Sequence, residues 1–171
     1  MEWLSDEQQV AWRSFVALLL RLPAALDGEL QKDAGITQFD YLVLSGLSEA
    51  PNRTLRMSEL AATASSSLSR LSHVVSRLEA RGWVRREQSA DDGRFINAVL
   101  TEEGWQKVVA TAPGYVAAVR ELLISTLTKE EFERLGAISA KVLAAQGIKV
   151  VIPNEGASAQ GIKAVIPNES A

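Results

Sequence analysis

Apolar residues recur at intervals of three or four along the first 35 residues of the chain. This spacing places them on one face of an α-helix. Ser5, followed three residues later by Gln8, has the form of a capping box and predicts where the helix starts. Pro23 predicts a kink or a break within this helix, and Gly35 predicts its end.

The same spacing returns after Thr101, where two glutamates in the first turn favour the start of another helix. Pro113 predicts an interruption, after which the pattern resumes to about Thr126. Thr128 and Glu131 form a second capping box that starts the last helix. These terminal helices carry more apolar surface than one layer of a small domain needs, so we expect that surface to have a partner, either the core of the chain itself or a second subunit.

The middle of the chain is divided into shorter elements by serine, proline and glycine. Two short helices joined by a tight turn are predicted there, which is a helix-turn-helix arrangement. The predicted elements are, in order, a helix capped by Thr37 that reaches Leu47, a short strand over 54–57, a helix over 59–63 capped by Ser58, and a helix capped by Ser65 or Ser66 that ends at Arg81 before Gly82.

A β-hairpin is predicted directly after these helices. Residues 83–88 and 95–100 are expected to be strands, and the Asp-Gly pair between them is a strong hairpin signal. A hairpin in this position, with Arg94 at its tip, is expected to act as a wing that enters the minor groove of DNA. Asp91 or Asp92 is expected to hold that arginine by a charge-assisted hydrogen bond.

The longer of the two central helices has two faces. An apolar stripe formed by Leu68, Leu71, Val75 and Leu78 is predicted to pack on the preceding helices. Small hydroxyl side chains on the opposite face allow close approach to a DNA groove, where serine and arginine bind phosphates or base edges. A plain solvated surface remains the alternative. The polar face carries Ser66, Ser67, Ser69, Arg70, Ser72, His73, Ser76 and Arg77.

The charge of the chain is distributed unevenly. The net charge is −3, yet the segment from Arg53 to Arg94 holds eight arginines against five carboxylates. Arginine is the residue best suited to bidentate contacts with phosphate and guanine. Charge alone leaves DNA binding and an ordinary solvated surface equally open.

Several classes of function are disfavoured. The chain has no cysteine, and no catalytic or metal-binding motif surrounds its single histidine, His73, so we predict no enzymatic activity, no cofactor and no metal site. The longest nearly apolar run, residues 15–20, is too short to cross a bilayer. The acidic N-terminus lacks a signal-peptide pattern. We therefore expect a cytoplasmic location and no membrane partner.

In these features the sequence resembles the MarR family of transcriptional regulators, whose members run helix, helix, short strand, helix-turn-helix, wing and two C-terminal helices. The wing pattern of the family is matched by Asp92-Gly93-Arg94, then Leu100-Thr101 and Gly104. The pattern that ends its recognition helix, Arg-Leu-Glu-x-Arg-Gly, is matched at residues 77–82. The resemblance covers residues 5–145 and is specific over 60–104.

The resemblance implies a mainly α fold with a small antiparallel β wing. Residues 36–101 would form a winged helix-turn-helix DNA-binding domain, and residues 1–35 and 102–145 would form dimerisation helices. The function implied is that of a sequence-specific transcriptional regulator, expected to be a repressor. It would bind palindromic operator DNA as a homodimer and be released by a small aromatic or phenolic ligand.

The resemblance also assigns site residues. Trp12, Phe15, Phe39 and Tyr41 are candidates to line a ligand pocket, although aromatic residues at helical spacing are more often core. The DNA-binding residues implied are Ser66, Ser67, Ser69, Arg70, Ser72, His73 and Arg77 on the helix and Arg85, Arg86 and Arg94 on the wing, with Asp92 as the brace of Arg94.

Two questions stay open. The chain could instead be a protein-interaction module on the same scaffold, without a direct role in DNA binding. The tail, residues 146–171, contains a duplication: residues 146–157 recur as 160–171 with two differences, at an offset of 14 residues. Such a tail is either a flexible extension or two short strands that pair with each other or with a partner.

Overall fold

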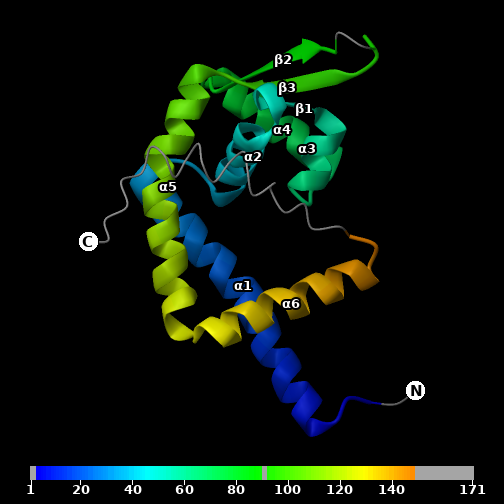
Figure 1. Ribbon diagram of the computed structural model, residues 1–171, viewed down its shortest axis with the longest axis vertical. Coiled ribbons are helices and arrows are strands. Elements are labelled where there is room, and N and C mark those ends of the chain that lie inside the picture. Colours follow the sequence, from blue (N-terminus) through cyan, green and yellow to red (C-terminus); the bar gives the residue numbers. More distant parts are fainter. Residues whose placement is uncertain (1–2, 90–91, 149–171) are drawn as a thin grey trace.

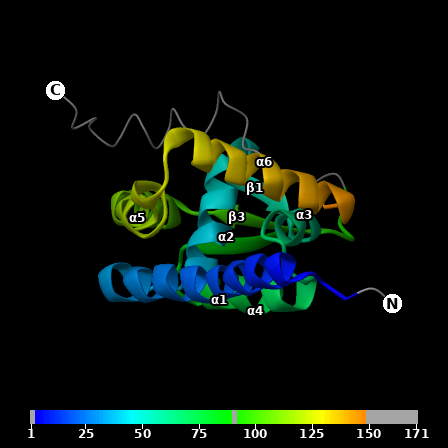
Figure 2. The same cartoon turned by 90° about the horizontal axis from the view of Figure 1, so that it is seen from below.

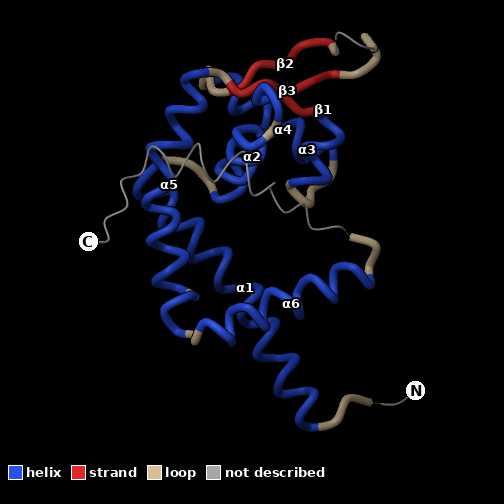
Figure 3. Tube along the Cα trace, viewed as in Figure 1, coloured by secondary structure: helices blue, strands red, loops and turns tan. Residues whose placement is uncertain are grey.

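The computed structural model describes residues 3–89 and 92–148 (Figures 1 and 3). It is mainly helical, with a small antiparallel sheet at one end, as predicted from the sequence. Its elements are α1 (Asp6–Ala34), α2 (Gln38–Glu49), the 3₁₀ turn η1 (Pro51–Arg53), β1 (Thr54–Arg56), α3 (Met57–Thr63), α4 (Leu68–Ala80), β2 (Val84–Gln88), β3 (Ile96–Leu100), α5 (Glu102–Leu122), the 3₁₀ turn η2 (Ile124–Thr126) and α6 (Lys129–Ala145).

The helix-turn-helix pair α3 and α4 is followed by the hairpin of β2 and β3, which forms the predicted wing. β3 lies between β1 and β2, and both pairings are antiparallel. Val99 of β3 is opposite Thr54 on one side and Arg85 on the other. The three short strands therefore tie the wing to the segment that precedes α3.

The core lies where the helices of the winged unit meet the sheet. Buried leucines from α2, α3 and α4 form its centre, and the cluster continues into Leu30 at the end of α1 and Val108 near the start of α5. The two long helices are thus anchored to the winged unit by the same core. The largest fully buried side chains are Ile36, Leu44, Leu47, Leu60, Leu71 and Leu78.

The capping signals in the sequence specify most helix starts correctly. Capping boxes are present at Ser5 and Gln8, at Thr37 and Asp40, and at Thr128 and Glu131. α1 ends where Gly35 adopts the left-handed conformation, with a φ of 64°. These signals are local in sequence, which is why they can be recognised without the fold.

Neither Pro23, where a kink or a break was predicted, nor Pro113, where an interruption was predicted, breaks its helix. α1 continues through Pro23 and α5 continues through Pro113, although a proline removes one helical hydrogen bond. In α5, Ala112 lies just before the proline and Ala118 beyond it, and both are buried. Packing on both sides of Pro113 therefore keeps the helix continuous.

Two predicted caps were also wrong. α3 begins at Met57, and the carboxylate of Glu59, not the side chain of Ser58, accepts from the first free N–H, that of Arg56, at 3.3 Å. α4 is capped by Ser67, because Ser65 is used in the turn with a φ of 48°. The turn is thus longer than predicted and the helix starts later.

The outer helices leave large apolar side chains uncovered. Over its length α6 has no buried residue, and Phe132, Ile138 and Val142 are exposed. In α1, Trp12 and Phe15 are exposed in the half that extends away from the winged unit (Figure 1). Figure 2 shows α1 and α6 on different sides of the chain. Within residues 3–89 and 92–148, neither apolar face is covered by another element.

Two segments, Asp6–Ala34 and Glu102–Thr126, are long and apolar enough, by length and composition alone, to cross a membrane. No span was predicted from the sequence, because its longest nearly apolar run, residues 15–20, is too short. Packed helices of globular proteins meet the same criteria. α5 is such a helix, since it packs against both α1 and α2.

Candidate DNA-binding surface

The outward face of α4 is polar. The helix buries Leu71, Val74, Val75 and Leu78, and successive residues are rotated by about 100°, so Ser69, His73 and Ser76 point away from the core. All three are exposed. Leu68, predicted to belong to the buried stripe, is instead 53% exposed, and Val74 takes its place in the core.

The serines before α4 are partly used by the fold. The hydroxyl of Ser67 accepts from the backbone N–H of Arg70 at 3.2 Å, which caps the helix. The hydroxyl of Ser66 donates to the carbonyl oxygen of Ser67 at 3.3 Å, and Ser66 is half-buried. Ser72, one turn further along, is half-buried on the side of the wing. The exposed polar positions of α4 are therefore fewer than its sequence suggests.

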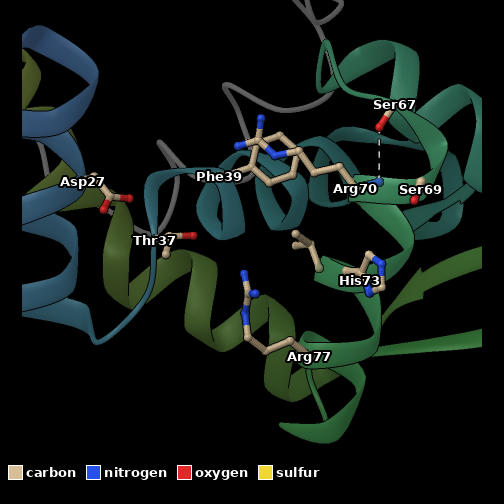
Figure 4. Close-up of a pocket in the computed structure, with 9 residues that line it drawn as sticks. Asp27, Thr37, Phe39, Ser67, Ser69, Arg70, His73 and Arg77 are labelled. Atoms are coloured by element: carbon tan, nitrogen blue, oxygen red, sulfur yellow. Dashed lines mark hydrogen bonds between the residues drawn. The ribbon is translucent and has the colours of Figure 1, made fainter. Parts of the chain in front are cut away.

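Two arginines of α4 point toward α2 (Figure 4). The guanidinium of Arg70 lies 4.3 Å from the centre of the Phe39 ring, a distance suited to a cation–π interaction. Arg77 forms an ion pair with Asp40, which is buried and whose other oxygen accepts from the backbone N–H of Thr37. Arg77 thus has a structural partner, whereas Arg70 keeps an exposed guanidinium.

An open pocket of about 620 Å³ lies between α4 and the junction of α1 with α2 (Figure 4). It combines an aromatic ring, several hydroxyls, the carboxylate of Asp27 and the guanidinium groups of Arg70 and Arg77, of which Arg77 is paired with Asp40. Its lining residues include Asp27, Thr37, Phe39, Ser69, Arg70, His73 and Arg77.

The arginine after the wing turn is held by one carboxylate. Arg94 is 86% exposed at its side chain, and its Nη2 donates to Oδ2 of Asp92 at 2.7 Å while its Nε donates to Oδ1 at 3.0 Å. The guanidinium holds the pKa of the Asp92 carboxyl below its usual value. Asp92, one of the two predicted braces, therefore pairs with Arg94, and Asp91 lies outside the described residues.

The other wing arginines differ from each other. Arg86 donates to Glu79 at 2.7 Å and to the hydroxyl of Ser76 at 2.9 Å, so it ties the wing to α4. This partner lowers the pKa of the Glu79 carboxyl. Arg85 is on the opposite face of β2 and pairs with Glu87 at 3.3 Å, with both side chains about half exposed.

The eight central arginines do not all gather on one face. Arg53 pairs with Glu102 at 2.9 Å, and Arg81 donates to the carbonyl oxygen of Gly35 at 3.0 Å, so both hold the framework. Arg56, missed from the sequence, lies 4.6 Å from the centre of the Phe95 ring and lines a groove with Arg86 and Arg94. Arg56 stands one residue before α3, and nothing in its local sequence indicates that it lines this groove.

The four candidate ligand-lining aromatics lie in three places. Trp12 and Phe15 are neighbours on α1, with ring centres 6.2 Å apart. Tyr41 is buried against Tyr115, with ring centres 4.6 Å apart. Phe39 alone lines the pocket beside α4. Within one chain they do not form a common cavity.

Burial of Tyr41 has a consequence at high pH. It raises the pKa of the Tyr41 phenol to about 12, above the ordinary value near 10. The unfolded chain therefore loses this proton first, and between about pH 10 and 12 the folded state should lose about 1.4 kcal/mol per pH unit. In urea unfolding at pH 9, 10 and 11, the difference in stability between the wild type and Tyr41→Phe should change little from pH 9 to 10 and most from pH 10 to 11. A difference between the two proteins that does not change with pH would contradict the prediction.

Comparison with known proteins decides the family. The sequence pattern of the MarR family matches residues 34–94. The regulator HosA of Escherichia coli is 34% identical over 98 residues, which are 57% of this chain and 70% of HosA. The chain belongs to the MarR family.

Solved MarR structures match most of the chain. Sco3205 of Streptomyces coelicolor, solved in complex with DNA, is 45% identical, with a TM-score of 0.81 over 86% of this chain and 91% of that one. AbsC, from the same organism, is 37% identical, with a TM-score of 0.81 over 85% of this chain and 98% of that one.

The transcriptional repressor MprA of E. coli is a further relative by sequence. It is 28% identical over 116 residues, which are 68% of this chain and 65% of MprA. These relatives are transcriptional regulators, not enzymes.

Proposed function

We propose that this MarR protein binds duplex DNA through α4 and the wing and regulates transcription from that site. The observation that carries the proposal is the outward face of α4, with Ser69 and His73, next to the largely exposed guanidinium of Arg94. The helix suits the major groove and the wing arginine the adjacent minor groove. The DNA complex of Sco3205, 45% identical, supports this assignment.

The unit that binds DNA is a homodimer. The exposed apolar faces of α1 and α6 need a partner, and a second copy offers the same faces through a two-fold axis. Such a dimer presents two α4 helices to a near-palindrome, with centres about 34 Å apart. The protein would act in the cytoplasm, as a repressor by analogy with MprA.

A small aromatic anion that binds in the pocket beside α4 would cause the protein to release the DNA. There it would stack on Phe39 and pair with Arg70, whose guanidinium is also available to DNA. Because the pocket borders both α1 and α4, its occupant can also bias the spacing of the two recognition helices. Screening of aromatic carboxylates by thermal shift, followed by DNA titration, would identify such a ligand.

Replacing Arg94 by alanine tests the proposal. The variant should bind every DNA sequence more weakly, by about tenfold to a hundredfold for the dimer, because each subunit loses one DNA contact. The negative slope of log affinity against log salt concentration should become shallower by about two. Fluorescence anisotropy with DNA that flanks the gene, at several salt concentrations, measures both quantities.

Lys129→Ala is the matched control, because its side chain is 82% exposed but lies at the start of α6. It removes the same charge and should leave the salt slope unchanged. The alternative function, a protein-interaction module, predicts the opposite pattern. Arg94→Ala should then cause little loss of function, whereas deletion of residues 147–171 should cause a large loss of function. Absence of DNA binding by a dimeric protein at low salt would overturn the proposal.

A further inference from the structure

Three large apolar side chains are exposed between α4 and the wing. Leu68, the first residue of α4, is 53% exposed, and Phe95, just before β3, and Ile96, its first residue, are 41% exposed each. All three line one groove of about 640 Å³ that also contacts the start of α3. We call Leu68, Phe95 and Ile96 the apolar strip. Such a cluster on a surface usually marks a binding site.

The rim of this groove is cationic. Arg56, Arg86 and Arg94 all line it, and the nearby carboxylates of Glu79 and Asp92 are already paired with Arg86 and Arg94. Because these two ion pairs are close to neutral, the excess positive charge at the rim comes from Arg56. An occupant with apolar groups for the floor and an anionic group for the edge fits this groove. A DNA strand has this combination, since deoxyribose carbons and thymine methyl groups lie beside phosphates.

We propose that Leu68 packs against the 5-methyl group of a thymine and is a specificity-determining residue for DNA binding. Phe95 and Ile96 cover deoxyribose of the strand that passes from the recognition helix to the wing. The inference rests on the proposed function, because it assigns a sequence preference to the same DNA-binding surface.

The position of Leu68 favours this contact. The first residues of a recognition helix lie closest to base edges in the major groove, and the thymine methyl is the apolar group displayed there. Leu68 stands between Ser67 and Ser69, with Ser72 one turn later, so its side chain extends beyond its small neighbours. Serine hydroxyls bond to several bases, whereas an apolar side chain separates thymine from cytosine.

Exchange of thymine for uracil tests the contact directly, since uracil lacks only the methyl group. A preferred duplex is first selected with the wild-type protein from a random palindromic library, and each thymine is then replaced in turn by uracil. At one symmetric pair of positions, uracil should weaken binding by the wild type about fourfold per half-site, or about fifteenfold for the dimer. At the same pair the Leu68→Ala variant should show no loss.

Leu42→Ala is the matched control, because Leu42 is 42% exposed on α2 and does not line this groove. It should keep the full uracil effect. If uracil weakens the wild type and Leu68→Ala equally, or weakens neither at any position, the inference is overturned while the proposed function stands. If the wild type selects and binds no duplex, the proposed function fails and the inference fails with it.

Discussion

Gly104→Ala should lower the free energy of unfolding by about 3 kcal/mol. A Cβ atom at residue 104 would lie 2.1 Å from the carbonyl oxygen of Trp83 and 2.7 Å from Cδ1 of Leu100. The first contact is with backbone, so a side-chain rotation cannot relieve it. The start of α5 or the end of the α4–β2 turn must move.

Neighbouring hydrogen bonds oppose that movement. The Thr101 hydroxyl donates to the carbonyl oxygen of Gly82 at 2.7 Å and accepts from the N–H of Gly104 at 3.0 Å. The N–H of Thr101 donates to the carbonyl oxygen of Trp83 at 3.0 Å. Because these bonds fix the start of α5 against the turn after α4, any shift that accommodates the methyl group weakens them.

Gly28→Ala is the matched control for this prediction. Gly28 is also inside a helix, and a Cβ there would meet no atom within 4 Å. The methyl group should therefore stabilise α1, by about 0.5–1 kcal/mol. Urea unfolding of both variants gives the two changes, which should have opposite signs. Equal stability of Gly104→Ala and the wild type would show that α5 does not approach Trp83 this closely.

Gly104 also illustrates what the sequence can reveal. Its place after Leu100 and Thr101 fits the MarR wing pattern, but only the structure explains it through the approach of the Trp83 carbonyl. The helix starts at Ser5, Thr37 and Thr128 were predictable, because each cap bonds to a residue three positions away. The order of the helices and strands and the position of the wing were also predictable from local sequence patterns.

The features that were mispredicted depend on contacts distant in sequence. Leu68 has the spacing of a core residue, but it stands in the first turn of α4, where the preceding helices do not cover it. Pro113 has the chemistry of a helix breaker, yet tertiary packing on both sides keeps α5 intact. The ion pair of Arg77 also has no local signal, because its partner, Asp40, is 37 residues earlier; the predicted DNA contact of Arg77 stays a prediction.

Asp40→Ala is expected to destabilise the protein by about 2 kcal/mol. The change removes the carboxylate that accepts from the N–H of Thr37, a cap worth about 1 kcal/mol, and the charged hydrogen bond from Arg77. The second contribution is limited to about 1 kcal/mol, because the Arg77 side chain is 47% exposed and solvent replaces part of the lost interaction. Asp40→Asn keeps an acceptor for Thr37 and should cost about half as much.

A double-mutant cycle with Asp40→Asn and Arg77→Met isolates the ion pair. If Arg77 serves to hold α4 against α2, the two changes should be less than additive in urea unfolding. Arg77→Met should then weaken DNA binding in the wild-type background but add little to Asp40→Asn. Arg70→Met, which removes an exposed guanidinium from the same helix without touching Asp40, should weaken DNA binding equally in both backgrounds. If Arg77→Met also weakens DNA binding equally in both backgrounds, as Arg70→Met should, then Arg77 binds DNA itself, and its ion pair with Asp40 opens when the duplex is bound.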